Sequence, residues 1–384
     1  MSKIKLGIIG IGNMGTGHAT NIIEGKCPEV ELVAVADINP KRLEWATENI
    51  EGIKTFDNAD DLINSGVVDS ILIAVPHYSH VEYAIKGFKK GLNVMCEKPA
   101  GVYTKQVLQM NEEAKKHDVV FGMMFNQRTN PMYIKMRELV KSGEYGEIRR
   151  TNWVITNWFR PQSYYDSGSW RATWAGEGGG VLLNQCPHQL DLWQWICGMP
   201  KSITAHLKYG AWHDIEVEDD VTAFAEYENG ATGVFVTTTG DCPGSNRFEI
   251  TLDKGKIVAE GNKLSVWKLD ESLKDYYGDL TNTFKAPEAQ TEEFEFENSG
   301  GQHIDVLNAF AAKILRGESL IADGAEGING LTISNAMHLS AFLDKKVELP
   351  IDADVYYEEL MRRVKTSRQK KEVEAVVSDT SGSY

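Results

Sequence analysis

The feature that most constrains this chain is a glycine-rich turn near its start. An apolar run at residues 4–9 ends at Gly10, and Gly12 and Gly15 complete a Gly-x-Gly-x-x-Gly pattern before a helix-like stretch. In the dinucleotide-binding fold the first glycine makes a tight turn, the second admits a diphosphate and the third packs helix on strand. The helix N-terminus adds amide donors and positive potential. The turn therefore predicts a Rossmann-type βαβ unit.

A second strand and a terminal acid give this turn the expected context. Residues 30–36 form a β-rich run that stops at Asp37, about 20 residues beyond the glycines. A carboxylate there can bind ribose hydroxyls and would repel a 2′-phosphate, so NAD is favoured over NADP. Basic residues at the start of the next helix could soften that preference, although a solvated helix face explains them more simply. Asn13 and Met14 in the turn are expected to contact the cofactor.

Length and charge limit the classes of protein to consider. With 384 residues the chain is too long for one ordinary core, so two domains are expected. Its net charge of −15 argues against nucleic acid or an anionic membrane as partner. The start of the chain has no apolar signal region, and the five scattered cysteines form no Cys-x-x-Cys pair. We expect a cytoplasmic protein without disulfides or a zinc site.

Apolar runs alternate with helix-like stretches as far as residue 125. The expected strands are 69–75, 93–96 and 119–125, and the expected helices are 41–50, 58–65, 81–90 and 104–116. This alternation is typical of a doubly wound, mostly parallel sheet, whose ligands bind beyond the carboxyl ends of the strands. The residues at those ends that we expect to contact the cofactor are Pro76, His80, Glu97, Lys98 and Asn126.

Lys98 needs its own explanation, because a lysine at the end of a buried strand rarely serves stability. Glu97 precedes it and Pro99 stiffens the turn. In one interpretation its ammonium group polarises an oxygen of a bound substrate and steers a proton. In the other it forms an ion pair with Glu97 or a neighbouring acid. We favour the first interpretation.

Beyond residue 126 the pattern changes to the strict alternation of half-buried strands. The expected strands are 147–158, 202–207, 220–227, 231–238, 246–252, 256–260 and 264–268, with helices at 131–142, 303–315, 324–343 and 352–367. Residues 269–299 are polar and are expected to form a long loop or insertion. We expect a dinucleotide-binding domain at 1–125, a second α/β domain for substrate binding and oligomerisation at 126–367, and a flexible tail at 368–384.

Four acids close together in the sequence, Glu216, Glu218, Asp219 and Asp220, invite comparison with a metal site. Carboxylates are the ligands that hard cations prefer. We favour the simpler interpretation that these acids flank the start of a strand in solvent. No bound metal is expected.

A glycine run in the second half precedes another candidate catalytic residue. Gly178–Gly180 let the backbone approach a ligand closely, and an apolar helix-like stretch follows. His188 comes directly after Pro187, which is well tolerated in a first helical turn. We expect His188 to face a nicotinamide, while the alternative is a buried structural histidine that caps a turn. Aromatic residues upstream, Trp158 among them, either stack on a sugar face or simply pack.

Several motifs, taken together, resemble one known family. They are Gly10-x-Gly12-x-x-Gly15, Asp37, Pro76-x-x-x-His80, Glu97-Lys98-Pro99, and the glycine run followed by His188 and Asp191. The chain resembles the glucose–fructose oxidoreductase / inositol dehydrogenase / MocA family to about residue 345. The resemblance implies a dinucleotide-binding domain followed by an α/β domain with a large open, mainly antiparallel sheet. It also implies NAD(P)-linked oxidation or reduction of a secondary alcohol on a sugar or cyclic polyol.

The resemblance also assigns residues. It implies Lys98 and His188 as the acid–base pair, and Trp170-Arg171 as cofactor contacts. The residues expected to contact the substrate are Arg128, Trp158, Asn184, Gln185 and His188. The subgroup it most resembles acts on anhydrosugars such as levoglucosan, on inositol-like polyols or on the C3 hydroxyl of glycosides. Many members carry an aspartate where this chain has Asn184, so the His188 cation is less stabilised here and Lys98 could share the base role.

Two other functions stay open for a chain of this kind. One is an NAD-dependent glycosidase or lyase that oxidises C3 only transiently. The other is a non-catalytic regulator that senses NAD, against which the presence of both Lys98 and His188 argues. An open sheet face needs covering, so a homodimer or homotetramer is expected.

Overall fold

The computed structural model describes residues 2–368, and its first layer is a parallel sheet of six strands in the order β3-β2-β1-β4-β5-β6. The strands are β1 (Ile4–Ile9), β2 (Val30–Ala36), β3 (Lys54–Phe56), β4 (Ser70–Ile73), β5 (Asn93–Cys96) and β6 (Phe121–Met123). The helices between them are α1 (Asn13–Ile23), α2 (Pro40–Asn49), α3 (Ala59–Asn64), α4 (His80–Lys89) and α5 (Thr104–Ala114). The strand order reverses between β1 and β4, and ligands of doubly wound sheets bind at such a reversal.

The second layer is a nine-stranded sheet in the order β14-β13-β12-β11-β7-β10-β9-β8-β15. Its strands are β7 (Ile148–Ile155), β8 (Ser202–Tyr209), β9 (Glu218–Glu226), β10 (Thr232–Thr238), β11 (Asn246–Leu252), β12 (Gly255–Glu260), β13 (Lys263–Leu269), β14 (Ala289–Glu295) and β15 (Val347–Glu348). All neighbours pair antiparallel except β7 and β10. The predicted fold class, a Rossmann sheet followed by a large and mainly antiparallel one, is confirmed.

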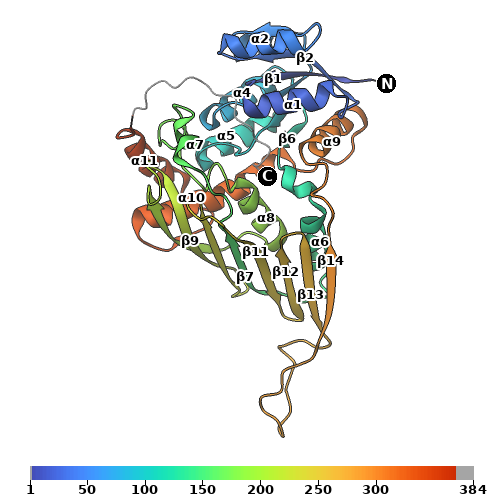
Figure 1. Cartoon of the computed structure of the whole chain (residues 1–384), viewed down its shortest axis with the longest axis vertical. Coiled ribbons are helices and arrows are strands. Elements are labelled where there is room, and N and C mark those ends of the chain that lie inside the picture. The colour runs from blue at the N-terminus through green and yellow to red at the C-terminus, as the bar shows by residue number, and fades with distance from the viewer. Residues whose placement is uncertain (1, 369–384) are drawn as a thin grey trace.

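Helices fill the space between the two sheets (Figure 1). They are α6 (Pro131–Lys141), α8 (Pro187–Cys197) and α10 (Gly327–Leu343), with α11 (Ala353–Val364) beside α10. Helix α10 contacts β8 on one side and α5 on the other, so it joins the two layers. Under α8 the core is aromatic: Trp153 stacks on Phe248 with ring centres 4.2 Å apart, and Trp193 stacks on Phe235 at 5.4 Å. This packing holds α8, and the residues at its start, rigidly above the second sheet.

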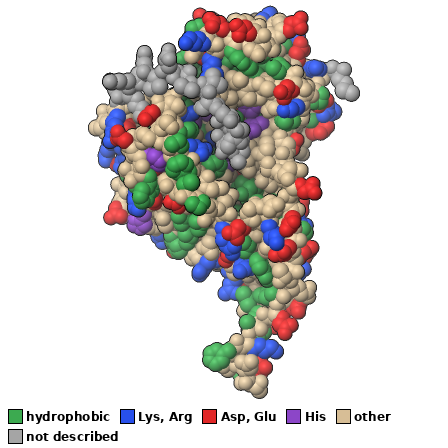
Figure 2. All heavy atoms as spheres, viewed as in Figure 1, with side chains coloured by type: hydrophobic (Ala, Val, Ile, Leu, Met, Phe, Trp, Pro, Cys, Tyr) green, Lys and Arg blue, Asp and Glu red, His purple; other side chains and the backbone are tan. Residues whose placement is uncertain are grey.

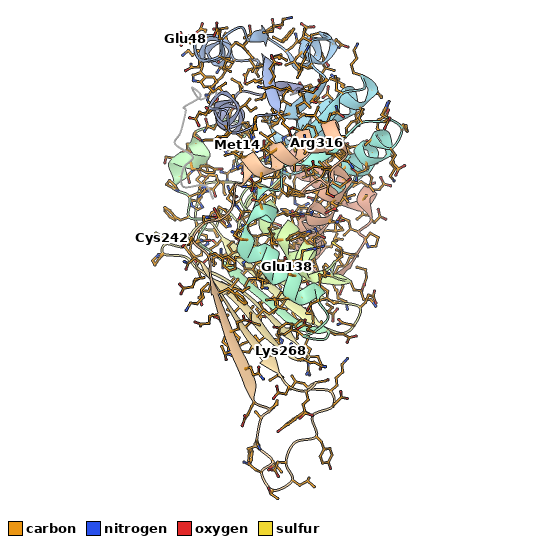
Figure 3. All side chains as sticks on the ribbon, turned by 90° about the vertical axis from the view of Figure 1, so that its right-hand side faces the viewer. Met14, Glu48, Glu138, Cys242, Lys268 and Arg316 are labelled. Carbon is orange, nitrogen blue, oxygen red and sulfur yellow. The ribbon has the colours of Figure 1, made fainter. Side chains whose placement is uncertain are left out.

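Helix α9 (His303–Arg316) returns to the first sheet, although it follows the second in the sequence. Its side chains Val306, Leu307 and Phe310 share one apolar cluster with β1 and β2. Arg316 also binds Glu29, just before β2, and Figure 3 shows Arg316 in the upper half of the molecule with Met14. The boundary expected near residue 125 remains a prediction, and α9 is the element that crosses it.

The segment expected to be one loop, 269–299, contains a strand. Strand β14 lies within it and pairs with β13 at the edge of the sheet. Its glutamates are exposed and face water on both sides of the strand. The connection 270–288 projects from the body as an arm (Figures 1 and 2). Tyr277, Leu280 and Phe284 on this arm are 84%, 78% and 96% exposed. The expected tail at 368–384 lies outside the described residues except for Arg368. No helix within residues 2–368 has the length and apolar character needed to cross a membrane.

Candidate active site

The glycine turn has the geometry that a bound diphosphate requires. Gly10 adopts a φ of +90°, and a Cβ there would lie 2.5 Å from the Ala74 carbonyl oxygen. A Cβ on Gly15 would collide with the Gly10 carbonyl, whereas one on Gly12 would meet no other described residue within 4 Å. Gly12 is the N-cap residue of α1 and has no side chain that could cap the helix. Gly10 therefore makes the predicted tight turn, Gly15 allows the close packing, and Gly12 leaves the backbone open. This geometry fits an NAD diphosphate.

Asp37 lies directly after β2, at the carboxyl edge of the first sheet. One carboxylate oxygen accepts a hydrogen bond from the Ile11 amide and the other from the Asn39 amide, each at 2.8 Å. The carboxylate so links the glycine turn to the start of α2. Because each oxygen can accept more than one hydrogen bond, Asp37 keeps capacity for ribose hydroxyls. Asn13 lies nearby and accepts a 3.5 Å hydrogen bond from Arg42.

The end of β5 carries a buried carboxylate and the predicted catalytic lysine. Glu97 binds His18 with 2.7 Å between Oε1 and Nε2. Burial pushes the pKa of Glu97 upward, but the His18 hydrogen bond and the charges of His18, His303 and Lys98 prevail and lower it to about 2. The Lys98 ammonium group donates to the Asn184 carbonyl at 2.8 Å. Within residues 2–368 it forms no ion pair with Glu97 or another acid, although the charges of Glu97 and Glu177 act on it, and its catalytic role remains a prediction.

His188 lies in the first turn of α8, just after Pro187. Its side chain is 5% exposed, and neither ring nitrogen has a hydrogen-bond partner among residues 2–368. Phe125 contacts the ring edge-on, at 6.4 Å between centres. Burial, followed by the charge of Lys98, lowers the pKa of His188 well below its usual value. A neutral imidazole with two unused nitrogens can accept a proton from a ligand.

A residue that the sequence analysis missed, Glu177, helps to join the two halves of the site. Its buried carboxylate binds the Asn184 side-chain amide and accepts from the Ala172 amide at 2.5 Å. Burial raises the pKa of Glu177. Asn184 therefore contacts Glu177 through its side chain and Lys98 through its carbonyl. The only signal in the sequence is a single acid next to the run Gly178–Gly180, too weak to indicate its role.

An aromatic loop forms the outer wall of this site. Tyr164 accepts a hydrogen bond from Arg171 at 2.8 Å and one from Gln185 at 3.2 Å. Trp170 lies edge-on to the buried His77, with ring centres 5.7 Å apart. Trp158 has a buried indole N–H without a partner among the described residues. The predicted residues Trp158, Arg171 and Gln185 thus belong to one wall, together with Tyr164.

Other predicted contacts have protein partners instead. The Arg128 guanidinium forms a two-point pair with Asp191, at 2.8 and 2.7 Å, and a further bond to Glu326 at 2.5 Å. Three of its five N–H donors are therefore used in ion pairs, and its expected contact with substrate remains a prediction. His80 binds two backbone carbonyls, and Asn126 donates to the Gln302 side chain. These bonds hold loops together, and the expected contacts of both residues with the cofactor remain predictions. Pro76 is exposed at the start of the turn that follows β4.

The four acids at 216–220 are not all in solvent, contrary to expectation. Glu218 and Asp219 are fully buried. Glu218 accepts from the Gly180 and Leu182 amides at 2.8 and 3.0 Å, so it positions the glycine run, and His338 lies 3.0 Å from its other oxygen. Asp219 binds the amides of the loop that follows β8. No group of His, Cys, Asp or Glu in the described part of the chain is arranged to hold a metal ion.

Two family models match the chain. Residues 4–125 match the model described as the oxidoreductase family with NAD-binding Rossmann fold of GFO/IDH/MocA, and residues 133–258 match the GFO/IDH/MocA C-terminal domain. Myo-inositol 2-dehydrogenase of Thermotoga maritima is 25% identical over 354 residues, which cover 90% of this chain and 98% of that protein. The rhizopine catabolism protein MocA of Rhizobium meliloti is 32% identical over 199 residues, 52% of this chain and 58% of that protein.

Solved structures share the whole architecture. The WlbA dehydrogenase of Bordetella pertussis, in complex with NADH and UDP-GlcNAcA, aligns with a TM-score of 0.76 and 26% identity, over 91% of this chain and 100% of that chain. Levoglucosan dehydrogenase in complex with NADH and levoglucosan aligns with a TM-score of 0.75 and 20% identity, over 91% and 100% of the two chains. The similarity to levoglucosan dehydrogenase shows a shared fold and nothing more.

Proposed function

Since the chain belongs to the GFO/IDH/MocA family of oxidoreductases, we propose that it is an NAD-dependent dehydrogenase that oxidises a secondary hydroxyl of a sugar, glycoside or cyclic polyol to a ketone. Relatives whose names specify inositol, and structures in complex with NADH and a sugar, support this substrate class. We assign cofactor binding to residues 1–125 and substrate binding mainly to residues 126–367.

The residues of the site suggest which group carries out each part of this reaction. NAD, when bound, supplies the acceptor for the hydride that leaves the carbinol carbon. His188 takes the proton from the hydroxyl, because its lowered pKa keeps the ring neutral. Lys98 stabilises the negative charge that develops on the oxygen. Glu177 positions Asn184, whose carbonyl in turn fixes the Lys98 ammonium group.

One observation carries the proposal: a buried imidazole without a partner lies on the same segment that fixes the Lys98 amine. Lys98 binds the carbonyl of Asn184, and His188 follows one turn later at the start of α8. A stable protein rarely leaves both nitrogens of a buried ring unsatisfied, so a ligand is the expected partner.

The test is a panel of pyranosides, anhydrosugars and inositols with NAD, followed by the absorbance of NADH. We expect NADH with at least one member, and its loss in Lys98→Met and His188→Ala with NAD binding intact. Full turnover in either variant would contradict the assigned roles. Release of an aglycone from a glycoside without net NADH would instead identify the transient-oxidation chemistry.

We also propose that the chain assembles as a homodimer or homotetramer. The second sheet exposes Val154 and Phe224 on the face turned away from the helices, and the arm carries the apolar residues Tyr277, Leu280 and Phe284 into solvent. Light scattering measures the assembly directly. We expect a stable oligomer that Phe284→Ser weakens, and a stable monomer for the unchanged chain would contradict the proposal.

A further inference from the structure

Two arginines in the outer wall of the site pack on one tyrosine ring. The Arg160 guanidinium carbon lies 5.2 Å from the centre of the Tyr164 ring, and that of Arg171 lies 4.5 Å from it. Arg160 also lies 5.7 Å from the Trp158 ring. Among the described residues neither arginine forms an ion pair with a carboxylate. Each is partly buried, so water neutralises its charge less than at the open surface.

A third cation lies within electrostatic reach of both arginines. Burial lowers the pKa of Lys98, the charges of Glu97 and Glu177 oppose this, and the weaker effects of Arg171 and Arg160 act in the same direction as burial. The acids nearby are Glu97 and Glu177, and both are already engaged, with His18 and with Asn184 respectively. Three cations, Lys98, Arg160 and Arg171, therefore lie near two acids, Glu97 and Glu177, in a chain whose net charge is −15.

The contacts of Arg160 with the two rings leave hydrogen-bond donors available. Cation–π contact holds a guanidinium plane against an aromatic face while its N–H groups point away from the ring edge. The Arg160 side chain donates one hydrogen bond among residues 2–368, to the neighbouring Phe159 carbonyl. The unpartnered indole N–H of Trp158 lies beside it. Such a set of planar donors matches a carboxylate or phosphate group.

We propose that Arg160, supported by Trp158, Tyr164 and Arg171, forms a subsite for an anionic group on the substrate, the carboxylate of a sugar acid or the phosphate of a sugar phosphate. This inference rests on the proposed function, since it names the substrate class of the same site. Arg171 is also expected to contact the cofactor, so Arg160 carries the assignment. The subsite favours anionic sugars over neutral ones of the same shape.

Binding calorimetry on the NAD-loaded protein tests this without requiring turnover. The probes are D-glucose, D-glucuronate and D-glucose 6-phosphate, which separate a carboxylate from a phosphate. We expect at least one anionic probe to bind about tenfold more tightly than glucose or better, and this preference to weaken with added salt. Arg160→Gln should remove most of the preference, and Arg160→Lys should retain part of it.

Arg247→Gln is the matched control, because Arg247 already pairs with Glu249 and Glu260 and lies on β11, outside the site. It should leave the preference unchanged. Equal binding of the three probes, or an undiminished preference in Arg160→Gln, would overturn the inference. A parallel loss of NAD affinity in Arg160→Gln would also overturn it, since the cation would then serve the cofactor. Absence of NADH with every sugar would refute the proposed function instead, and is measured separately.

Discussion

Helix α8 carries two polar residues one turn apart, and their surroundings differ completely. Asp191 is bound by Arg128 at two points and by Gln194 at 3.0 Å. His188 is equally buried, yet neither of its ring nitrogens has a partner among residues 2–368. The same helix, which Trp193 packs on Phe235 of the second sheet, therefore carries one residue paired with other side chains and one whose ring nitrogens have no partner in the described chain.

The comparison teaches how to separate structure from function among buried polar groups. A buried charge that is paired with its counter-charges needs no ligand, and removing one partner leaves the other uncompensated and destabilises the fold. A buried polar group without partners costs stability and is retained for another reason. By this criterion the Arg128 pair is explained by the fold, and His188 is the residue that we propose to act on a ligand.

The largest effect is expected for His188→Gln, which tests whether the residue without protein partners acts in the reaction. Turnover should fall by roughly a thousandfold, because the proton acceptor is lost. The free energy of unfolding should change by less than about 1 kcal/mol, since no protein hydrogen bond is broken. Steady-state kinetics and urea denaturation measure the two. A large loss of stability with little loss of turnover would reverse the assignment.

Asp191→Asn tests the structural end. We expect a loss of about 3 kcal/mol in the free energy of unfolding, because Arg128 would stay buried with only Glu326 as counter-charge. Chemical denaturation provides the measurement. At a temperature where the variant is folded, its turnover should stay within a few-fold of the unchanged protein, and a selective loss of turnover would show that the pair acts in catalysis.

Asp37 tests whether a polar group must be either structural or functional, because it binds two backbone amides and is also predicted to bind the cofactor. For Asp37→Ser we expect the KM for NAD to rise about tenfold as the carboxylate acceptor is lost. Activity with NADP should increase as the repulsion of a 2′-phosphate disappears. Kinetics with both cofactors decide this, and an unchanged ratio of NAD to NADP efficiency would mean that Asp37 only holds the turn.

The smallest effect is a shift of the pH profile. The pKa of His188 lies well below 6.5, so the ring stays neutral and the acid limb of kcat/KM should fall below pH 6.5. The pKa of Lys98 is lowered from 10.5, so its charge is lost, and the alkaline limb begins, below pH 10.5. In Lys98→Arg that limb should move upward, because arginine keeps its proton. An alkaline limb unmoved by this change would belong to another group.

Much of the fold followed from local patterns in the sequence. The glycine turn and Asp37 predicted the first sheet, because each residue there has a backbone role that few others can fill. Strand β14 was missed because glutamates face water on both of its sides, so it lacks the alternation of a half-buried strand. Strand β3 has only three residues, too few for a periodic signal.

The site was less predictable, because partners distant in sequence decide each role. Lys98 and His188 were selected from their positions at element ends, and their catalytic roles remain predictions. The pairing of Arg128 with Asp191 and Glu326 was not foreseen, because it depends on three separate segments. For the same reason the buried carboxylate of Glu218, which holds the glycine run, looked like a solvated acid.

Because helix α9 completes the core of the first sheet, that core can finish folding only after α9 has been synthesised. The apolar surface that Val306, Leu307 and Phe310 cover belongs to β1 and β2, which emerge first. The nucleotide-binding half therefore stays incomplete, with that surface open to water, until residue 316 has left the exit tunnel. A truncated product that ends near residue 125 would carry the same uncovered surface and be prone to aggregate.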